Sequence, residues 1–267
     1  MKVFITCVLL NLPVVLFAQS WELVKNVSHA GIDKCSIDQM GNVYMVNQQG
    51  TVSKYTADGK LMLEYAPIQV ANIHEITANS QLKVTLFYKD LQEFVLLNRY
   101  LSSPITYRLS DFNLGYIEEV APNFQQTLWV LDISDFSIKL LDPSRNQLLE
   151  QKSLAQVLDQ NQAEIQSFHA HQNRMYIVEK SLGVLVFDNI GNYLFKLTSE
   201  APDDVGFDKD YMYYEKEGSL MLVHLYDGEN LTRSIDNIQF TKMVYSNSRL
   251  IAITPQGFNI YQYLSQQ

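Results

Sequence analysis

The sequence predicts an all-β fold, a six-bladed β-propeller closed by an N-terminal strand that completes the last blade. Three observations support this prediction. A turn phrase at residues 38–42, followed by an apolar strand pattern, has looser echoes at a spacing of roughly forty residues, which is typical of stacked small sheets. Apolar and polar residues alternate along many short segments, as in half-buried strands. The last repeat is one strand short, and residues 21–27 supply a strand pattern ahead of the first.

The first repeat is the clearest of the six. Asp38 precedes Gly41 within one polar turn, and Asp58 directly precedes Gly59 in another. An aspartate accepts backbone hydrogen bonds in a tight turn and a glycine adopts positive φ there, so these pairs indicate hairpins. The strands of this repeat are expected at residues 32–37, 43–47, 52–55 and 61–65.

The later repeats follow the same order with weaker turns. In the second and third, strands are expected at residues 73–78, 84–88, 93–97 and 105–107, and at 117–121, 127–131, 137–141 and 148–149. In the fourth and fifth, they are expected at residues 165–168, 174–178, 183–187 and 193–197, and at 205–207, 211–214, 220–225 and 231–233. The sixth repeat has three strands, at residues 240–244, 250–253 and 258–263.

Closure of the ring explains the missing strand. A propeller whose last blade is joined to its first leaves no raw sheet edge exposed. We therefore expect residues 21–27 to form the outer strand of the blade that contains residues 240–263. Two packed sheets with the same local chemistry are the alternative.

One stretch between the third and fourth repeats departs from the β pattern. Ser153 and Gln156 have the spacing of a helix-capping box, and Leu154, Val157 and Leu158 share one helical face. This pattern predicts a turn or two of helix, with a looped connection as the alternative.

The N-terminal segment has the pattern of an export signal. Lys2 is followed by an apolar run over residues 3–17 and by the small residue Ala18. The run has about fifteen residues, fewer than the roughly 20 that a membrane-spanning helix needs. We therefore predict a cleaved signal peptide at residues 1–18, a single propeller domain at residues 19–267, no membrane insertion after cleavage, and a periplasmic or secreted location. The only other cysteine, Cys7, would leave with the signal peptide, so Cys35 would have no disulfide partner. We expect Cys35 to be a buried small apolar residue.

The charge balance limits the classes of partner. The chain has 29 acidic and 20 basic residues, a formal net charge of −9, and no run of basic residues. Phosphate backbones and anionic lipids both attract clustered lysine and arginine, so nucleic acid and anionic membrane surfaces are disfavoured as partners.

The turn and strand at residues 38–47 resemble the repeat of NHL-type propellers, in which Gly-Asn precedes an apolar-aromatic strand. Residues 55–60 are similar to the next part of that repeat, and residues 188–193 resemble its later turn. The chain is also similar to uncharacterised exported propeller proteins of Gram-negative bacteria. Propellers host many functions, so the resemblance implies a fold and little chemistry.

Polar residues mark the start of each expected inner strand. In a propeller these starts converge around one mouth of the central channel, so we predict a binding site there. Its candidate residues are Asp33, His74, Glu75, Glu118, Glu119, Gln166, Asp203, Asp204 and Gln239. Such carboxylates are suitable ligands for a divalent cation such as calcium, although most surface carboxylates are simply solvated.

Other candidate chemistry is weaker. His169 and His171 would lie on the same side of a strand, which hints at a metal, but their place after Phe168 predicts exposed hairpin residues. The sequence has no Gly-x-Ser-x-Gly elbow and no phosphate-binding loop. Most of the aromatic residues on the second strands are expected to pack between blades.

Two functional hypotheses follow. The preferred one is a non-enzymatic binding or scaffold propeller of the cell envelope, which presents one face to a protein or glycan and needs no cofactor. The alternative is a metal-dependent hydrolase similar to six-bladed lactonases, with Asp33, Glu75, Glu118 and Asp203 around a calcium-like ion. That family also needs asparagine ligands, which the matching inner strands do not supply.

Overall fold

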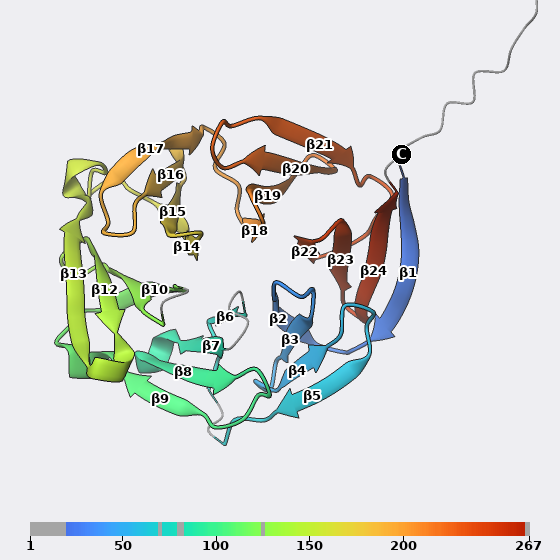
Figure 1. Ribbon diagram of the computed structural model, residues 1–267, viewed down its shortest axis with the longest axis horizontal. Coiled ribbons are helices and arrows are strands. Elements are labelled where there is room, and N and C mark those ends of the chain that lie inside the picture. Colours follow the sequence, from blue (N-terminus) through green and yellow to red (C-terminus); the bar gives the residue numbers. More distant parts are fainter. Residues whose placement is uncertain (1–19, 69–70, 79–82, 124–125, 265–267) are drawn as a thin grey trace, which may run out of the picture.

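Six four-stranded antiparallel sheets stand around a central axis and form a six-bladed β-propeller (Figure 1). The computed structural model describes residues 20–68, 71–78, 83–123 and 126–264, and the predicted signal peptide lies outside these residues. The inner strand of each sheet faces the axis and the outer strand forms the rim (Figure 1). The predicted fold class is therefore confirmed.

The first blade consists of β2 (Ile32–Ile37), β3 (Val43–Asn47), β4 (Val52–Tyr55) and β5 (Leu61–Tyr65). The second consists of β6 (Glu75–Thr77), β7 (Lys83–Tyr88), β8 (Glu93–Asn98) and β9 (Ile105–Arg108). The third consists of β10 (Ile117–Pro122), β11 (Leu128–Asp132), β12 (Ser137–Asp142) and β13 (Gln147–Ser153). The fourth blade consists of β14 (Ile165–His171), β15 (Arg174–Glu179), β16 (Gly183–Phe187) and β17 (Tyr193–Thr198). The fifth consists of β18 (Gly206–Asp208), β19 (Tyr211–Lys216), β20 (Ser219–His224) and β21 (Asn230–Ser234). The sixth consists of β22 (Lys242–Ser246), β23 (Arg249–Thr254), β24 (Gly257–Leu264) and β1 (Ser20–Ser28).

The ring closes as the sequence predicts. Strand β1 pairs antiparallel with β24, from Ser20 opposite Leu264 to Ser28 opposite Gly257. The N-terminal strand thus forms the outer edge of the last blade, and the two ends of the described chain lie side by side (Figure 1). Because backbone hydrogen bonds join the first and last segments, the blade at the seam is as complete as the others.

Two turns share one aspartate-based hydrogen-bond pattern. The Oδ1 atom of Asp38 accepts from the backbone N–H groups of Met40 and Asn42, both at 2.9 Å. Asp188 repeats this pattern in the hairpin between β16 and β17, where the N–H of Asn192 donates to it at 2.8 Å. Gly191, which has φ of +84°, precedes Asn192. The turn at Asp188 is the later turn of its blade, as its sequence indicates.

The predicted helix is a single 3₁₀ turn, η4 (Leu154–Gln156). Ser153 caps it by accepting a hydrogen bond from the N–H of Ala155 at 3.2 Å. Leu154 and Leu158 are buried between the third and fourth blades. Three further 3₁₀ turns in the described residues, η1 (Lys89–Leu91), η2 (Leu109–Phe112) and η3 (Pro143–Arg145), follow strands β7, β9 and β12.

The core is divided among the wedges between neighbouring blades. Each of six apolar clusters in the described residues joins side chains of two adjacent sheets, including one across the seam between the first and last blades. Trp129 and Tyr176 are among the largest fully buried side chains. The expected role of second-strand aromatics as packing between blades is therefore confirmed for these rings.

Candidate functional site: the central cavity

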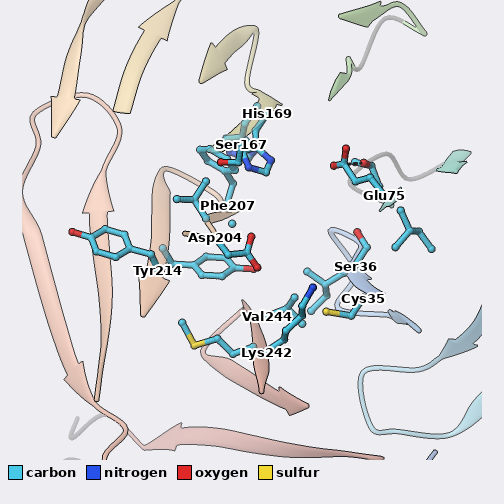
Figure 2. Close-up of a pocket in the computed structure, with 18 of the residues that line it drawn as sticks. Cys35, Ser36, Glu75, Ser167, His169, Asp204, Phe207, Tyr214, Lys242 and Val244 are labelled. Carbon is cyan, nitrogen blue, oxygen red and sulfur yellow. Dashed lines mark hydrogen bonds between the residues drawn. The ribbon is translucent and has the colours of Figure 1, made fainter. Parts of the chain in front are cut away.

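The inner strands of all six blades surround one cavity of about 1040 Å³ on the propeller axis. Its wall includes residues from β2, β6, β10, β14, β18 and β22, together with the segment that leads into β18. Figure 2 shows side chains from opposite blades pointing toward this space. Any ligand at the centre is therefore within reach of residues that are far apart in the sequence.

β-Bulges at the start of the inner strands decide which side chains reach the cavity. The pairing register skips one residue on the inner strand in the first, third and fourth blades, at Asp33, Glu118 and Gln166. A bulge places two residues opposite one partner and interrupts the strict alternation of sides. Lys34, Glu119 and Ser167, the residues that follow, line the cavity.

Most of the predicted site residues come together at the cavity. Those that line it are His74, Glu75, Glu119, Gln166, Asp203 and Asp204. Asp33 and Glu118 do not line it; they are paired with Lys34 at 3.4 Å and with Lys89, respectively. Gln239 lies in a separate polar pocket of about 390 Å³ on the last blade, beside Asn237 and Asn259.

Glu75 has the most unusual environment in the cavity. Its Oε1 atom accepts a hydrogen bond from the Thr77 hydroxyl at 3.2 Å, and its buried Oε2 atom has no partner. Burial, together with the nearby Glu119 carboxylate, raises the pKa of Glu75 to about 8. Glu119 itself lies 3.1 Å from the His74 ring nitrogen Nε2. Near neutral pH, Glu75 therefore holds a proton most of the time.

Strand β14 forms another wall of unpartnered polar atoms. Gln166 donates an amide hydrogen to Asp203 at 3.3 Å, while its own Oε1 atom is buried without a partner. Ser167 Oγ and His169 Nε2 are also buried without a partner. Burial lowers the pKa of His169 to about 4, so the imidazole is neutral at physiological pH.

The expectation that His169 and His171 are exposed hairpin residues is wrong. Strand β14 continues three residues beyond its predicted end, because His169, Ala170 and His171 keep pairing with β15. His171 lines the cavity, stacks on Phe207 with ring centroids 4.9 Å apart, and lies 2.6 Å from the Lys209 carbonyl.

Acidic and basic groups also meet on the cavity wall near β18 and β22. The Asp204 side chain is exposed to the cavity yet largely enclosed by protein; burial raises its pKa, and Lys242 partly offsets this effect. Burial also raises the pKa of the Cys35 thiol to about 12. Cys35 was expected to be buried; it is partly buried in the cavity wall, and its raised pKa disfavours the reactive thiolate form. Figure 2 shows Lys242 beside Cys35 and Ser36.

Several residues of this site were absent from the sequence-based set. Ser167, His169 and Lys242 all line the cavity. The alternation of polar and apolar residues over residues 167–171 was a usable signal for the first two, because it indicates that the strand continues past Phe168. Lys242 has no comparable signal, since its position depends on the start of β22.

Two findings on the described residues concern metal ions and membranes. No group of three or more histidine, cysteine, aspartate or glutamate side chains is placed to hold a metal ion in that part of the chain. Among the same residues, no helix is long and apolar enough to cross a membrane.

Comparisons with known proteins identify the fold. No family model matches the chain, and no curated protein matches it. A streptogramin B lyase structure matches with a TM-score of 0.57 and 11% identity, over 92% of this chain and 88% of that one. YCF48 bound to D1 peptide matches with a TM-score of 0.56 and 10% identity, over 94% and 99%.

PorZ, a surface component of the type-IX secretion system of Porphyromonas gingivalis, matches with a TM-score of 0.55 and 8% identity. That match covers 92% of this chain and 39% of PorZ. At identities this low the similarity concerns the fold alone, because one fold hosts many functions.

Proposed function

We propose that the chain is a non-enzymatic binding propeller of the cell envelope, which presents the mouth of its central cavity to a protein partner. The observation that supports this proposal is a cavity that all six blades line and in which buried polar atoms on β6 and β14 have no partner. Unsatisfied buried polar groups are costly, so they favour a ligand that completes their hydrogen bonds.

The cellular part of the proposal depends on the sequence. The signal-like residues 1–18 favour export, and PorZ, which has a similar fold, is a bacterial surface component. YCF48, another protein of similar fold, binds a peptide. A glycan partner has less support, since none of the similar structures reported above has a glycan in its description, and Phe207, one of the aromatic residues of the cavity, already packs against His171 and Tyr176.

Site-specific photo-crosslinking in intact cells tests the proposal. A photo-reactive amino acid is placed at Asp203, which is exposed at the cavity, or at Met62, which is exposed on the outer strand β5. We expect a discrete protein adduct from position 203, none from position 62, and recovery of the chain in the envelope fraction. Equal adducts from both positions would overturn the proposed face, and a chain confined to the cytoplasm would overturn the envelope location.

A further inference from the structure

We propose that the central cavity is a guanidinium site, which takes an arginine side chain of the partner between Glu75 on β6 and the polar residues of β14. This inference rests on the proposed function, because it names the group by which the partner would be anchored. It concerns four side chains that the fold encloses and leaves incompletely paired: Glu75, Gln166, Ser167 and His169.

The first wall of the site is Glu75. Its Oε2 atom is buried and unpartnered, and the carboxyl group is enclosed by protein. Figure 2 shows this carboxyl pointing into the cavity toward the strand that carries Ser167 and His169. A carboxylate in this position has one oxygen that no donor of the described residues satisfies.

The second wall is the start of β14. Gln166 Oε1, Ser167 Oγ and His169 Nε2 are all buried without partners and all line the cavity. A neutral imidazole accepts through its unprotonated nitrogen, and a hydroxyl accepts as readily as it donates. The four unpartnered atoms can therefore all act as acceptors, and they match a ligand that is rich in N–H donors.

The charge of the wall favours a cation. Seven carboxyl groups and three lysines line the cavity. The charged groups that act on Glu75 are Glu119 and Asp204, and both disfavour its ionised form. Lys242 and Lys34 act instead on Cys35, and Lys242 also acts on Asp204. A cation beside Glu75 would relieve repulsion that these lysines leave in place.

The chemistry of the site favours guanidinium over a metal ion or an ammonium group. Among the described residues, no three or more histidine, cysteine, aspartate or glutamate side chains are grouped closely enough to hold a metal ion. Guanidinium has five N–H donors in one plane and is more weakly hydrated than ammonium. It therefore loses less on entering an enclosed site, and its several donors match a wall that has several acceptors.

Binding of this kind is linked to a proton. A guanidinium favours the carboxylate form of Glu75, whereas the free site holds the proton up to a pKa of about 8. Binding near neutral pH therefore releases a proton from Glu75, and affinity rises with pH until the free carboxyl is ionised. His74, which pairs with Glu119, and Thr77, which donates to Glu75, are the other polar groups around this carboxyl.

Calorimetric titration of the full chain with N-acetyl-arginine methylamide tests the inference. The neutral isostere N-acetyl-citrulline methylamide is the ligand control. The variants are Glu75→Gln and the matched exposed change Glu22→Gln on β1. We expect the arginine probe to bind, the citrulline probe to fail, and Glu75→Gln to weaken binding at least tenfold while Glu22→Gln does not. Proton release, measured in buffers of different ionisation enthalpy, should disappear in Glu75→Gln.

Other results would overturn the inference. The inference fails if the two probes bind equally, or if the arginine probe shows no binding up to about 10 mM, which corresponds to a binding free energy of about −3 kcal/mol. It also fails if the two variants bind the arginine probe with equal affinity. Circular dichroism confirms that each variant is folded. The cross-linking experiment separates the two proposals. Adducts at position 203 without arginine binding would remove the guanidinium site and keep the binding propeller. Arginine binding without adducts at position 203 would remove the binding propeller and keep the guanidinium site.

Discussion

Two buried carboxyl groups in this propeller have opposite surroundings. Asp132, on β11 of the third blade, is completely buried and saturated with donors. It accepts hydrogen bonds from Lys139 Nζ at 2.7 Å, from the N–H of Gly115 at 2.8 Å and from the N–H of Ser134 at 3.0 Å. Glu75, on β6 of the second blade, has one donor, Thr77, and one oxygen with none.

This difference separates a structural carboxylate from one that is available to a ligand. The network around Asp132 joins β11 to β12 and to the loop before β10, so the fold itself satisfies this carboxylate. A buried polar group that lacks a partner destabilises the fold, and it is retained where a ligand can supply the missing bond. If this distinction holds, changes in the saturated network should affect stability most.

Removal of the cation from the saturated network should be severely destabilising. Lys139 is 5% exposed and bridges Asp132 and Asp135, each at 2.7 Å. Burial alone would lower the pKa of Lys139, but its hydrogen bonds to the two aspartates outweigh burial and raise it. Lys139→Met leaves Asp132 buried without its charge partner, and we expect a loss of about 3–5 kcal/mol in the free energy of unfolding.

Urea denaturation measures this effect. Lys60→Met, on an exposed residue of the first blade, is the control and should change stability by less than about 0.5 kcal/mol. A similarly small loss for Lys139→Met would show that the saturated network is not structural, and the contrast with Glu75 would then fail.

At the seam that closes the ring, the Trp21 side chain also has its partners within the fold. Trp21 on β1 donates its indole N–H to the Ser234 carbonyl at 3.0 Å and packs on Tyr263 with ring centroids 5.0 Å apart. Because Trp21 is only half-buried, Trp21→Ala should cost about 2–3 kcal/mol, less than a fully buried tryptophan. Trp21→Phe, which keeps a ring and loses the donor, should cost about 1 kcal/mol. Equal, negligible losses in chemical denaturation would show that β1 contributes little to closure.

The structural regions were the ones that the sequence could predict. Alternation and turn chemistry are local properties, so the strands of the first blade were predicted to the residue, and the incomplete last repeat located β1. The turns at Asp38 and Asp188 were predictable for the same reason, since each aspartate bonds to backbone groups within four residues of itself.

The site was less predictable, because it depends on which way side chains point across the axis. Bulges at Asp33 and Glu118 interrupt alternation, and a sequence pattern does not show where a bulge falls. The contribution of Ser167 and His169 depends on how far β14 pairs with β15, which long-range packing decides. The unpartnered oxygen of Glu75 is a property of the assembled ring and has no local signature.

The open carboxyl should affect stability in the opposite sense from Asp132. The folded pKa of Glu75, about 8, lies above its ordinary value of 4.5, so the folded state binds more protons between these values. Stability due to this group is therefore full below about pH 4.5 and is lost as pH rises toward 8. Glu75→Gln keeps the shape and removes the titration.

We expect the free energy of unfolding of Glu75→Gln to equal that of the wild type near pH 4.5. At pH 8 it should be larger than that of the wild type by about 1–2 kcal/mol, once screening by solvent is allowed for. Thermal or urea unfolding across this pH range measures the difference, with Glu22→Gln as the exposed control. A variant that is less stable than the wild type at pH 8 would mean that the Glu75 carboxylate has a structural partner after all.

Calcium should have the smallest effect, and it decides what kind of ligand the open carboxyl accepts. A metal at a hundred times its Kd stabilises by about 2.7 kcal/mol, which for a domain of this size is a shift of roughly 5–10 °C. Asp33 and Glu118 lie outside the cavity and Glu75 holds its proton near neutral pH, so we expect less than about 1 °C between EDTA and saturating calcium. A shift of several degrees that Glu75→Gln abolishes would make the open carboxyl a metal ligand. It would then favour the metal-dependent hydrolase over the guanidinium site, while the contrast with the saturated Asp132 would stand.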